Sequence, residues 1–352
     1  MDHHRKSFLT MSTLCFILLV SMVVLMEAAR PSPLLLSIVD AEEEAQNTGG
    51  RKLFKLVNSN QLVLPYHNGP LLTGSSSLNV YLIWYGDFSR AQKSTIVDFL
   101  ASFQQTSEEV VEHPSVSSWW KMTASYKDTK NAVPFSSISL AGQKTDAYSL
   151  GKKLKKLDIE ALLLEALAPG SLPIPFPADS KAIYFVLTAH DVFVQDFCMN
   201  SCASHFFTSP TPAVENLMLP YAWVGNSGEQ CPGLCAWPFA LPHFGPLGAK
   251  PLIPPNGDVG IDGMVINMAS MLAGAATNPF NNGYYQGDAS APLEAATACM
   301  GIYGQGAYPG FPGELLVQPI SGASYNTDGI NDRKFLLPAL WNPTSLACTP
   351  PS

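Results

Sequence analysis

The chain has 352 residues, of which 14 % are charged and 47 % hydrophobic, and its formal net charge is -8. A mildly acidic chain with so few basic residues lacks the positive surface that binding to nucleic acid or to an anionic membrane requires. The 29 prolines and 26 glycines indicate long loops held by rigid turns.

The N-terminus has the pattern of a secretory signal. A basic start precedes an almost unbroken apolar run from Phe8 to Met26, and Ala28 and Ala29 offer small residues for cleavage. We expect residues 1–29 to be removed and the mature chain to be secreted, but the run is also long enough to remain as a membrane anchor. Residues 30–60 are acidic and poor in aromatic residues, which predicts a disordered arm or pro-segment before a single domain at 61–352.

The first half of this domain alternates strand and helix patterns. The segment Leu78–Tyr85 is apolar on both faces, which predicts a strand in the middle of a sheet. Ser89 is placed to cap a following helix whose apolar residues recur at helical spacing up to Phe103. A second helix is expected to carry the tryptophans at 119–120.

The same alternation continues further along the chain. Residues 133–140 are expected to form a strand, and 152–167 have the pattern of an amphipathic helix. Ala182–Leu187 predicts a second buried strand, and 219–224 is the clearest strand in the loop-rich region that follows. The order of these elements predicts an α/β fold, a mixed sheet with flanking helices, together with a long loop region stapled by disulfides.

Six cysteines remain once Cys15 leaves with the signal. An even number in a secreted chain predicts disulfides, because thiols are oxidised outside the cell. We favour bridges between the two Cys-x3-Cys segments, which leaves the last two cysteines to pair. The spacing of the first segment, with His205 three residues beyond it, also fits a zinc site. The six are Cys198, Cys202, Cys231, Cys235, Cys299 and Cys348.

Two further groups of side chains are candidates for a site. His190 and Asp191 follow a buried strand, a common position for functional residues in α/β folds, but a capped turn explains them as well. Tyr221 and Trp237 lie in the loop-rich region and could stack on a carbohydrate, together with the glycine- and tyrosine-rich loop 281–287. Most large aromatic side chains are, however, simply part of a core.

The segment Asp262–Ala276 predicts a buried helix, because nearly all its side chains are small or apolar. A loop rich in glycine, asparagine and aspartate precedes it, and Asn278-Pro279 ends it. The aspartates 258, 262 and 288 match no calcium-binding loop, so turn and capping roles are expected for them.

Long motifs across the mature chain resemble the plant EXORDIUM-like family, also called phosphate-induced proteins. The resemblance implies a secreted protein of the apoplast or cell wall, linked to growth, cell expansion and brassinosteroid or nutrient status. It brings no established catalytic activity and no cofactor, and it implies a wall polysaccharide or an extracellular receptor as partner. The matching segments include LNVYLIWYG (78–86), CPGLCAWPF (231–239), PPNGDVGIDGMVINMASMLAG (254–274) and TNPFNNGYYQG (277–287).

A second resemblance concerns the helix alone. Residues 269–279 are similar to the Ser-His-Glu-Leu-Ala-Glu-Ala-x-Thr-Asp-Pro helix of some secreted microbial zincin-like proteins. Ser270 stands in place of the histidine, Met271 of the first glutamate, Gly274 of the second glutamate and Asn278 of the aspartate. Neither serine nor methionine can bind zinc and activate water as that motif does.

These patterns favour a degenerate zincin-like core without metal, and a protein that binds rather than catalyses. Two alternatives stay open. One is an extracellular hydrolase of wall glycan or protein that uses Asp191 with His190 or His205. The other is a carbohydrate-binding protein that uses Tyr221 and Trp237.

Overall fold

The computed structural model describes residues 62–351 except 75–76, 106–112, 169–170, 175–180, 200, 245–247 and 289–290. The described residues belong to one compact unit, Asn60–Ser352. The expected signal segment and acidic arm, residues 1–60, lie outside the described residues.

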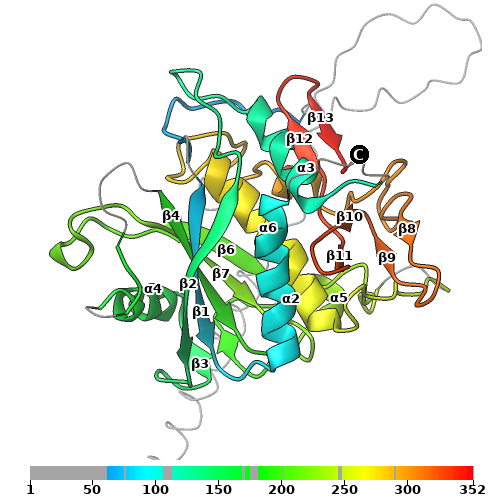
Figure 1. Ribbon diagram of the computed structural model, residues 1–352, viewed down its shortest axis with the longest axis horizontal. Coiled ribbons are helices and arrows are strands. Elements are labelled where there is room, and N and C mark those ends of the chain that lie inside the picture. Colours follow the sequence, from blue (N-terminus) through cyan, green and yellow to red (C-terminus); the bar gives the residue numbers. More distant parts are fainter. Residues whose placement is uncertain are drawn as a thin grey trace, which may run out of the picture. The chain divides into compact units, whose positions relative to one another are not determined.

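A five-stranded sheet in the order β2-β1-β4-β7-β6 forms the centre of this unit (Figure 1). Four strands are parallel, and β6 pairs antiparallel with β7 at one edge. Every residue of β4 and β7 is buried, as expected for strands covered on both faces. The predicted mixed α/β fold is confirmed. The strands are β1 (Leu78–Tyr85), β2 (Ile138–Asp146), β4 (Ala182–Thr188), β6 (Ala203–Phe207) and β7 (Pro220–Gly225).

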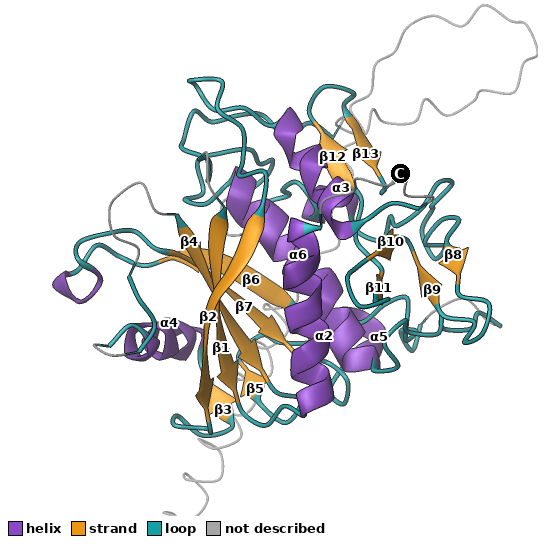
Figure 2. Ribbon diagram, in the orientation of Figure 1, coloured by secondary structure: helices purple, strands orange, loops and turns teal. Residues whose placement is uncertain are grey.

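Helices cover both faces of the sheet (Figure 2). On one face α2 (Arg90–Ala101) packs on β2, while α6 (Val259–Thr277) packs on α2, β6 and β7. On the other face α4 (Lys156–Ala166) packs on β4. Ser89 caps α2 as predicted, because its side chain accepts from the backbone N of Gln92.

The predicted tryptophan-bearing helix is α3 (Val116–Lys121). Trp119 and Trp120 are both fully buried, and their indole N–H groups donate to the backbone carbonyls of Pro338 and Phe135. These bonds satisfy the only polar group of each ring inside the core.

Two predicted elements differ in their bounds, and some short strands were not predicted. The helix expected over 152–167 begins only at Lys156, because Lys153–Leu154 forms a short strand, β3, that pairs with β5 (Phe193–Val194). The strand expected over 133–140 runs instead from 138 to 146. The edge strand β6 was not predicted, since its sequence ASHFF lacks a clear alternation of apolar and polar residues.

Helix α6 is the most enclosed of the described helices. Of its 19 residues only Val259, Asn267 and Ser270 are not buried. Asp258 caps its start by accepting from the backbone N of Ile261 at 3.0 Å. In the described part of the chain α6 is the one helix long and apolar enough to cross a membrane, but its side chains pack inside the protein. The helix predicted over 262–276 is therefore confirmed, with one further turn at its start.

The C-terminal third consists mainly of loops and short antiparallel pairs. These join β8 with β9, β10 with β11 and β12 with β13. The strands of these pairs are β8 (Leu316–Val317), β9 (Ser324–Tyr325), β10 (Thr327–Asp328), β11 (Lys334–Phe335), β12 (Leu340–Asn342) and β13 (Ala347–Thr349). A short helix, α5 (Pro232–Cys235), precedes α6.

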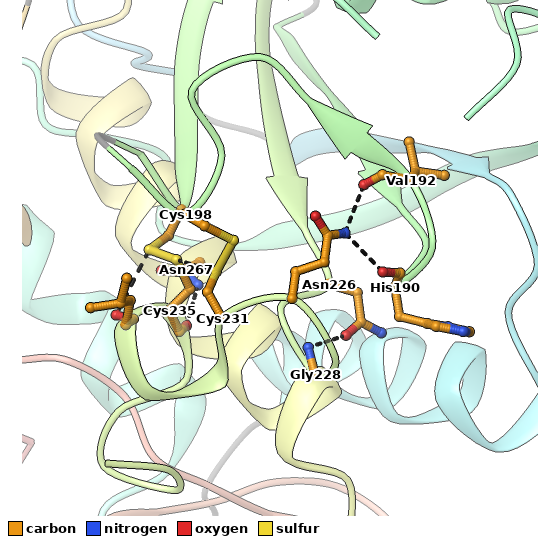
Figure 3. Close-up of a disulfide and its surroundings, with 11 residues drawn as sticks. His190, Val192, Cys198, Asn226, Gly228, Cys231, Cys235 and Asn267 are labelled. Atoms are coloured by element: carbon orange, nitrogen blue, oxygen red, sulfur yellow. Dashed lines mark hydrogen bonds between the residues drawn. A yellow bond between two sulfur atoms is a disulfide. The ribbon is translucent and has the colours of Figure 1, made fainter. Parts of the chain in front are cut away.

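Three disulfides staple the loop regions before and after α6, in the pairing that the sequence favoured. They join Cys198 to Cys231, Cys202 to Cys235 and Cys299 to Cys348. The first two connect the start of β6 with α5, and the side chain of Asn267 on α6 donates to the backbone carbonyl of Cys235 at 2.9 Å (Figure 3). The alternative in which these cysteines bind zinc is wrong, because all four sulfurs are in disulfides.

Replacing Cys299 and Cys348 together by alanine is expected to lower the free energy of unfolding by about 2–5 kcal/mol. The bridge closes a long loop and restricts the unfolded chain, so its removal raises the conformational entropy of the unfolded state. The sequence separation is 49 residues. Urea unfolding of both proteins under non-reducing conditions measures the difference. Equal unfolding midpoints would contradict a stabilising role for this bridge.

Candidate functional site

The zincin-like positions lie on α6 and just beyond its end. Ser270 is half-buried, and its hydroxyl donates to the carbonyl of Ile266 at 3.0 Å, so it is bonded to its own helix. Met271 is part of the hydrophobic core. Gly274 and Asn278 are buried. Of these four, only Gly274 and Asn278 adjoin other polar side chains.

Those neighbours form a buried cluster that we call the His205–Glu294–Asn278 cluster. His205 Nε2 lies 2.9 and 2.8 Å from the two carboxylate oxygens of Glu294. The amide of Asn278 donates to Glu294 Oε1 at 2.7 Å and accepts from the backbone N of Gly283 at 2.7 Å. The side chains of His205 and Glu294 are 5 % and 4 % exposed.

The missing side chain of Gly274 makes room for this cluster. A Cβ atom added at Gly274 would lie 2.7 Å from Glu294 Oε2 and 3.1 Å from His205 Nε2. The carboxylate of Glu294 and the imidazole of His205 therefore occupy the space into which a side chain at this position would project. A side chain at the position that carries the second glutamate in the zincin-like helix would have to displace the Glu294 carboxylate here.

The cluster does not fit a metal ion. A carboxylate oxygen accepts hydrogen bonds, so we assign the proton of His205 to Nε2, which faces Glu294. The remaining atom, His205 Nδ1, is buried and has no hydrogen-bond partner among the described residues. Within the described ranges no group of three or more His, Cys, Asp or Glu side chains is arranged to hold a metal ion.

The other predicted polar candidates lie in separate networks. Asp191 accepts from Lys152 at 2.5 Å and from the Tyr148 hydroxyl at 3.1 Å. Partial burial raises the pKa of Asp191, but the hydrogen bonds from Lys152 and Tyr148 outweigh that effect and hold the pKa below its usual value. His190 Nε2 lies 3.4 Å from a carboxylate oxygen of Glu229.

His190 lines a pocket of about 380 Å³ where β4 and β7 end and α6 begins. The backbone around it is fixed, because the side chain of Gln230 donates to the carbonyls of His190 and Val192 (Figure 3). Asn226 similarly accepts from the backbone N of Gly228 at 3.0 Å. The structure thus brings together His205, Gly274 and Asn278, whereas His190 and Asp191 bond to other partners.

The aromatic candidates are engaged within the protein. Tyr221 is 7 % exposed and packs beside Phe206. Burial, with the nearby carboxylate of Glu160, raises the pKa of Tyr221 to about 12. Trp237 is half-buried against Tyr303, with ring centroids 5.8 Å apart.

The tyrosines of the loop 281–287 are also stacked on neighbours, Tyr284 on Tyr66 and Tyr285 on His67. Of these four rings only His67 is exposed, whereas Tyr66, Tyr284 and Tyr285 are half-buried.

A second polar network, which the sequence did not predict, lies at the opposite end of α6. Asp262 is 2 % exposed, and its two oxygens accept from the backbone N and the side-chain N of Asn256 at 2.9 and 2.6 Å. Burial raises the pKa of Asp262 to about 7; Asp258 adds to the rise, while the Asn256 bonds and Arg333 oppose it. The network continues to Arg333, whose Nη1 donates to Asn256 Oδ1 at 3.1 Å.

We expect Gly274→Ala to lower the free energy of unfolding by about 1–3 kcal/mol, although alanine favours a helix, because its Cβ must displace a carboxylate held by three hydrogen bonds. The matched control is Ser270→Ala in the same helix, which loses only a bond to its own backbone and should change stability by less than about 0.5 kcal/mol. Denaturant unfolding measures both. A neutral Gly274→Ala would contradict the close packing at this position.

The raised pKa of Asp262 makes stability depend on pH. Its folded-state pKa of about 7 exceeds the ordinary value of 3.8, so the folded protein binds this proton more tightly than the unfolded chain does. The contribution of this proton to the free energy of unfolding is fully present below about pH 4. It is lost as pH rises towards 7, which lowers the free energy of unfolding by about 4 kcal/mol in all.

In Asp262→Asn the side chain is neutral at every pH. The decrease in the free energy of unfolding between pH 4 and 7 should therefore be smaller than in wild type by about 4 kcal/mol. Urea unfolding at several pH values compares the slopes, and the exposed Asp87→Asn serves as control. Parallel profiles for wild type and Asp262→Asn would show that this carboxyl does not titrate in the window.

Comparison with known proteins identifies the family. Residues 64–351 match the family model described as "Phosphate-induced protein 1 conserved region". The chain is 48 % identical over 305 residues to Protein PHOSPHATE-INDUCED 1 of Nicotiana tabacum, covering 85 % of this chain and 92 % of that protein. It is 46 % identical over 323 residues to Protein EXORDIUM of Arabidopsis thaliana, covering 90 % and 96 %.

Protein EXORDIUM-like 2 of Arabidopsis thaliana is 46 % identical over 304 residues, covering 86 % of this chain and 93 % of that protein. No solved structure matches the chain. The matches extend over nearly the whole described unit, including both ends of α6. The chain therefore belongs to the phosphate-induced, or EXORDIUM-like, protein family.

Proposed function

We propose that this chain is a secreted protein of the plant extracellular space or cell wall, which acts by binding and not by catalysis in the control of growth and cell expansion. The observation that carries the non-catalytic part is the filling of the Gly274 position by Glu294 and His205. A His–Glu pair in that place has the composition of an acid–base pair, but its side chains are about one-twentieth exposed and bonded to one another. A group that acts on a substrate has to reach it within hydrogen-bond distance.

Two observations support secretion. The first 29 residues have the charge and apolar pattern of a signal segment. The three disulfides are of the kind that form and persist in an oxidising compartment. The link to growth and nutrient status rests on membership of the family, and the partner is either a wall polysaccharide or an extracellular receptor.

The zincin-like ancestry of α6 is part of this proposal. It rests on the eleven residues 269–279 and on the burial of the helix beside an edge strand. A fold that once held a metal at this helix would keep the enclosed helix and replace its ligands by groups that satisfy one another. Ser270, bonded to Ile266, and the His205–Glu294–Asn278 cluster have that character.

Protein purified with its disulfides intact should contain far less than one zinc per chain, and addition of EDTA should leave Tm unchanged, because the described residues hold no group of three or more His, Cys, Asp or Glu side chains arranged for the ion. Elemental analysis and thermal unfolding make these two measurements. Stoichiometric zinc, together with hydrolysis of wall glycans or peptides that stops on chelation, would overturn the proposed function. Ser270→Ala serves as the matched control. Because the Ser270 hydroxyl is expected to contribute to no activity, any hydrolysis that is measured should be the same in this variant as in wild type.

A further inference from the structure

A polar pocket of about 450 Å³ opens beside the middle of α2, and we call it the Arg333 pocket. Four segments far apart in the sequence form it: helix α2, the loop before α6, the turn after β8 and the turn between β10 and β11. Its volume falls within the range of sites that bind small molecules, about 300–1,000 Å³. Its lining residues are Ser94, Asp98, Pro255, Asn256, Gln318, Asn331, Asp332, Arg333 and Lys334.

Arg333 is held in place on three sides. Its Nε donates to Asp98 Oδ2 at 3.0 Å, its Nη1 to Asn256 Oδ1 at 3.1 Å and its Nη2 to Ser94 Oγ at 3.4 Å. Asp98 also accepts from the side chain of Asn331 at 3.0 Å. Binding a ligand to this guanidinium would therefore cost little side-chain entropy, which is what distinguishes a prepared site from a loose surface.

The side chain of Asn256 is fixed from behind. Its amide nitrogen donates to the buried Asp262 at 2.6 Å and to the carbonyl of Lys334 at 3.0 Å, while its oxygen accepts from Arg333. Three of the four hydrogen-bonding positions of this amide are thus occupied, all but one lone pair of its oxygen. The buried carboxylate of Asp262 therefore supports the pocket wall without reaching the pocket.

The basic side chains of the lining are both paired with carboxylates. Arg333 is bonded to Asp98 at 3.0 Å and Lys334 to Asp328 at 2.7 Å. With Asp332 as a further acidic lining residue, this charge balance leaves no unpaired positive charge in the lining to attract an anion. The other polar lining groups are amides and a hydroxyl, which offer donors and acceptors together, as the vicinal hydroxyl groups of a sugar do.

We propose that the Arg333 pocket binds a neutral, hydroxyl-rich glycan of the cell wall. Asp332 offers an acceptor. The side-chain nitrogen of Gln318 offers donors, since among the described residues its side chain is bonded through its oxygen alone, to Ser321 at 2.6 Å. Two N–H groups of Arg333 remain beyond its three bonds. These groups bind sugar hydroxyls at the mouth of the pocket.

A longer glycan also finds apolar contacts beside the pocket. Gln318 begins the β8–β9 turn, which is closed by a bond from the backbone N of Gly322 to the carbonyl of Gln318 at 2.9 Å. Ile320 in this turn is 98 % exposed, and Val317 is 57 % exposed. Exposed aliphatic side chains next to a polar pocket suit the C–H faces of a saccharide chain that extends out of it.

This inference rests on the proposed function and assigns it a site, so the test separates the two. Secreted full-length protein is titrated calorimetrically with cellohexaose and with xyloglucan heptasaccharide as neutral probes, and with hexagalacturonate as an anionic probe. We expect a neutral probe to bind, and Kd to rise at least about tenfold in Asp332→Asn and in Gln318→Ala, as for loss of a hydrogen bond to a ligand.

Both substitutions are chosen to preserve the fold. Asp332 has φ of +58°, a conformation that asparagine also tolerates, and Gln318 is partly exposed. The matched controls are Asp87→Asn and Gln105→Ala, two exposed residues outside the pocket. Each control should keep the wild-type Kd, and all four variants should keep the wild-type Tm.

Three results would overturn the pocket assignment. If the pocket variants bind the neutral probe as well as wild type does, the glycan binds elsewhere and the binding function still stands. If only hexagalacturonate binds, the argument from charge balance is wrong. If no probe binds, the protein recognises another partner such as a receptor, whereas cleavage of a probe that requires zinc would instead overturn the proposed function.

Discussion

The burial of α6 on all sides is the constraint on which the rest of the structure depends. A polar group inside a protein costs free energy unless it is hydrogen-bonded. The hydroxyls of Ser270 and Thr277 bond to the helix backbone, but the longer polar side chains at the two ends need partners from other segments. Asp262 near its start is bonded by Asn256, and Asn278 at its end is bonded to Glu294. The loops before and after the helix are therefore held in place by the helix that they enclose.

The two ends of α6 differ in how their polar networks finish. At the C-terminal end the network is closed, since Glu294 accepts from His205 and Asn278 and all three side chains are buried. At the N-terminal end it continues outward from Asp262 through Asn256 to Arg333, which lines an open pocket. Only the N-terminal end thus has polar groups both supported from within and accessible to a ligand.

The sequence predicted what local patterns determine. The central strand β1, the capped helix α2 and the enclosed helix α6 follow from apolar periodicity and from Ser89 as a cap. The short strand β3 and the edge strand β6 were missed because tertiary pairing, and not their own residues, makes them strands.

The candidate site was predicted only in part, for a related reason. His205, Gly274 and Asn278 were singled out from spacing and resemblance, but Glu294, which joins them, is 89 residues from His205 in sequence. Arg333 and Asp98 are 235 residues apart. Pairs at such separations leave no periodic signal in a single sequence. A signal existed only for Asp262, a charged residue within an otherwise apolar helix, which requires a buried partner.

Whether a histidine and a carboxylate form a catalytic pair depends on their access and on their spare hydrogen-bonding capacity, and not on their identity. Glu294 uses both oxygens on protein donors, so a substrate could bind it only by breaking those bonds. Asp332 and the amide nitrogen of Gln318 keep capacity free at the protein surface. The Arg333 pocket thus has polar groups that a partner could reach, while the His205–Glu294–Asn278 cluster holds β6, the end of α6 and the loop before η4 (Thr297–Cys299) together.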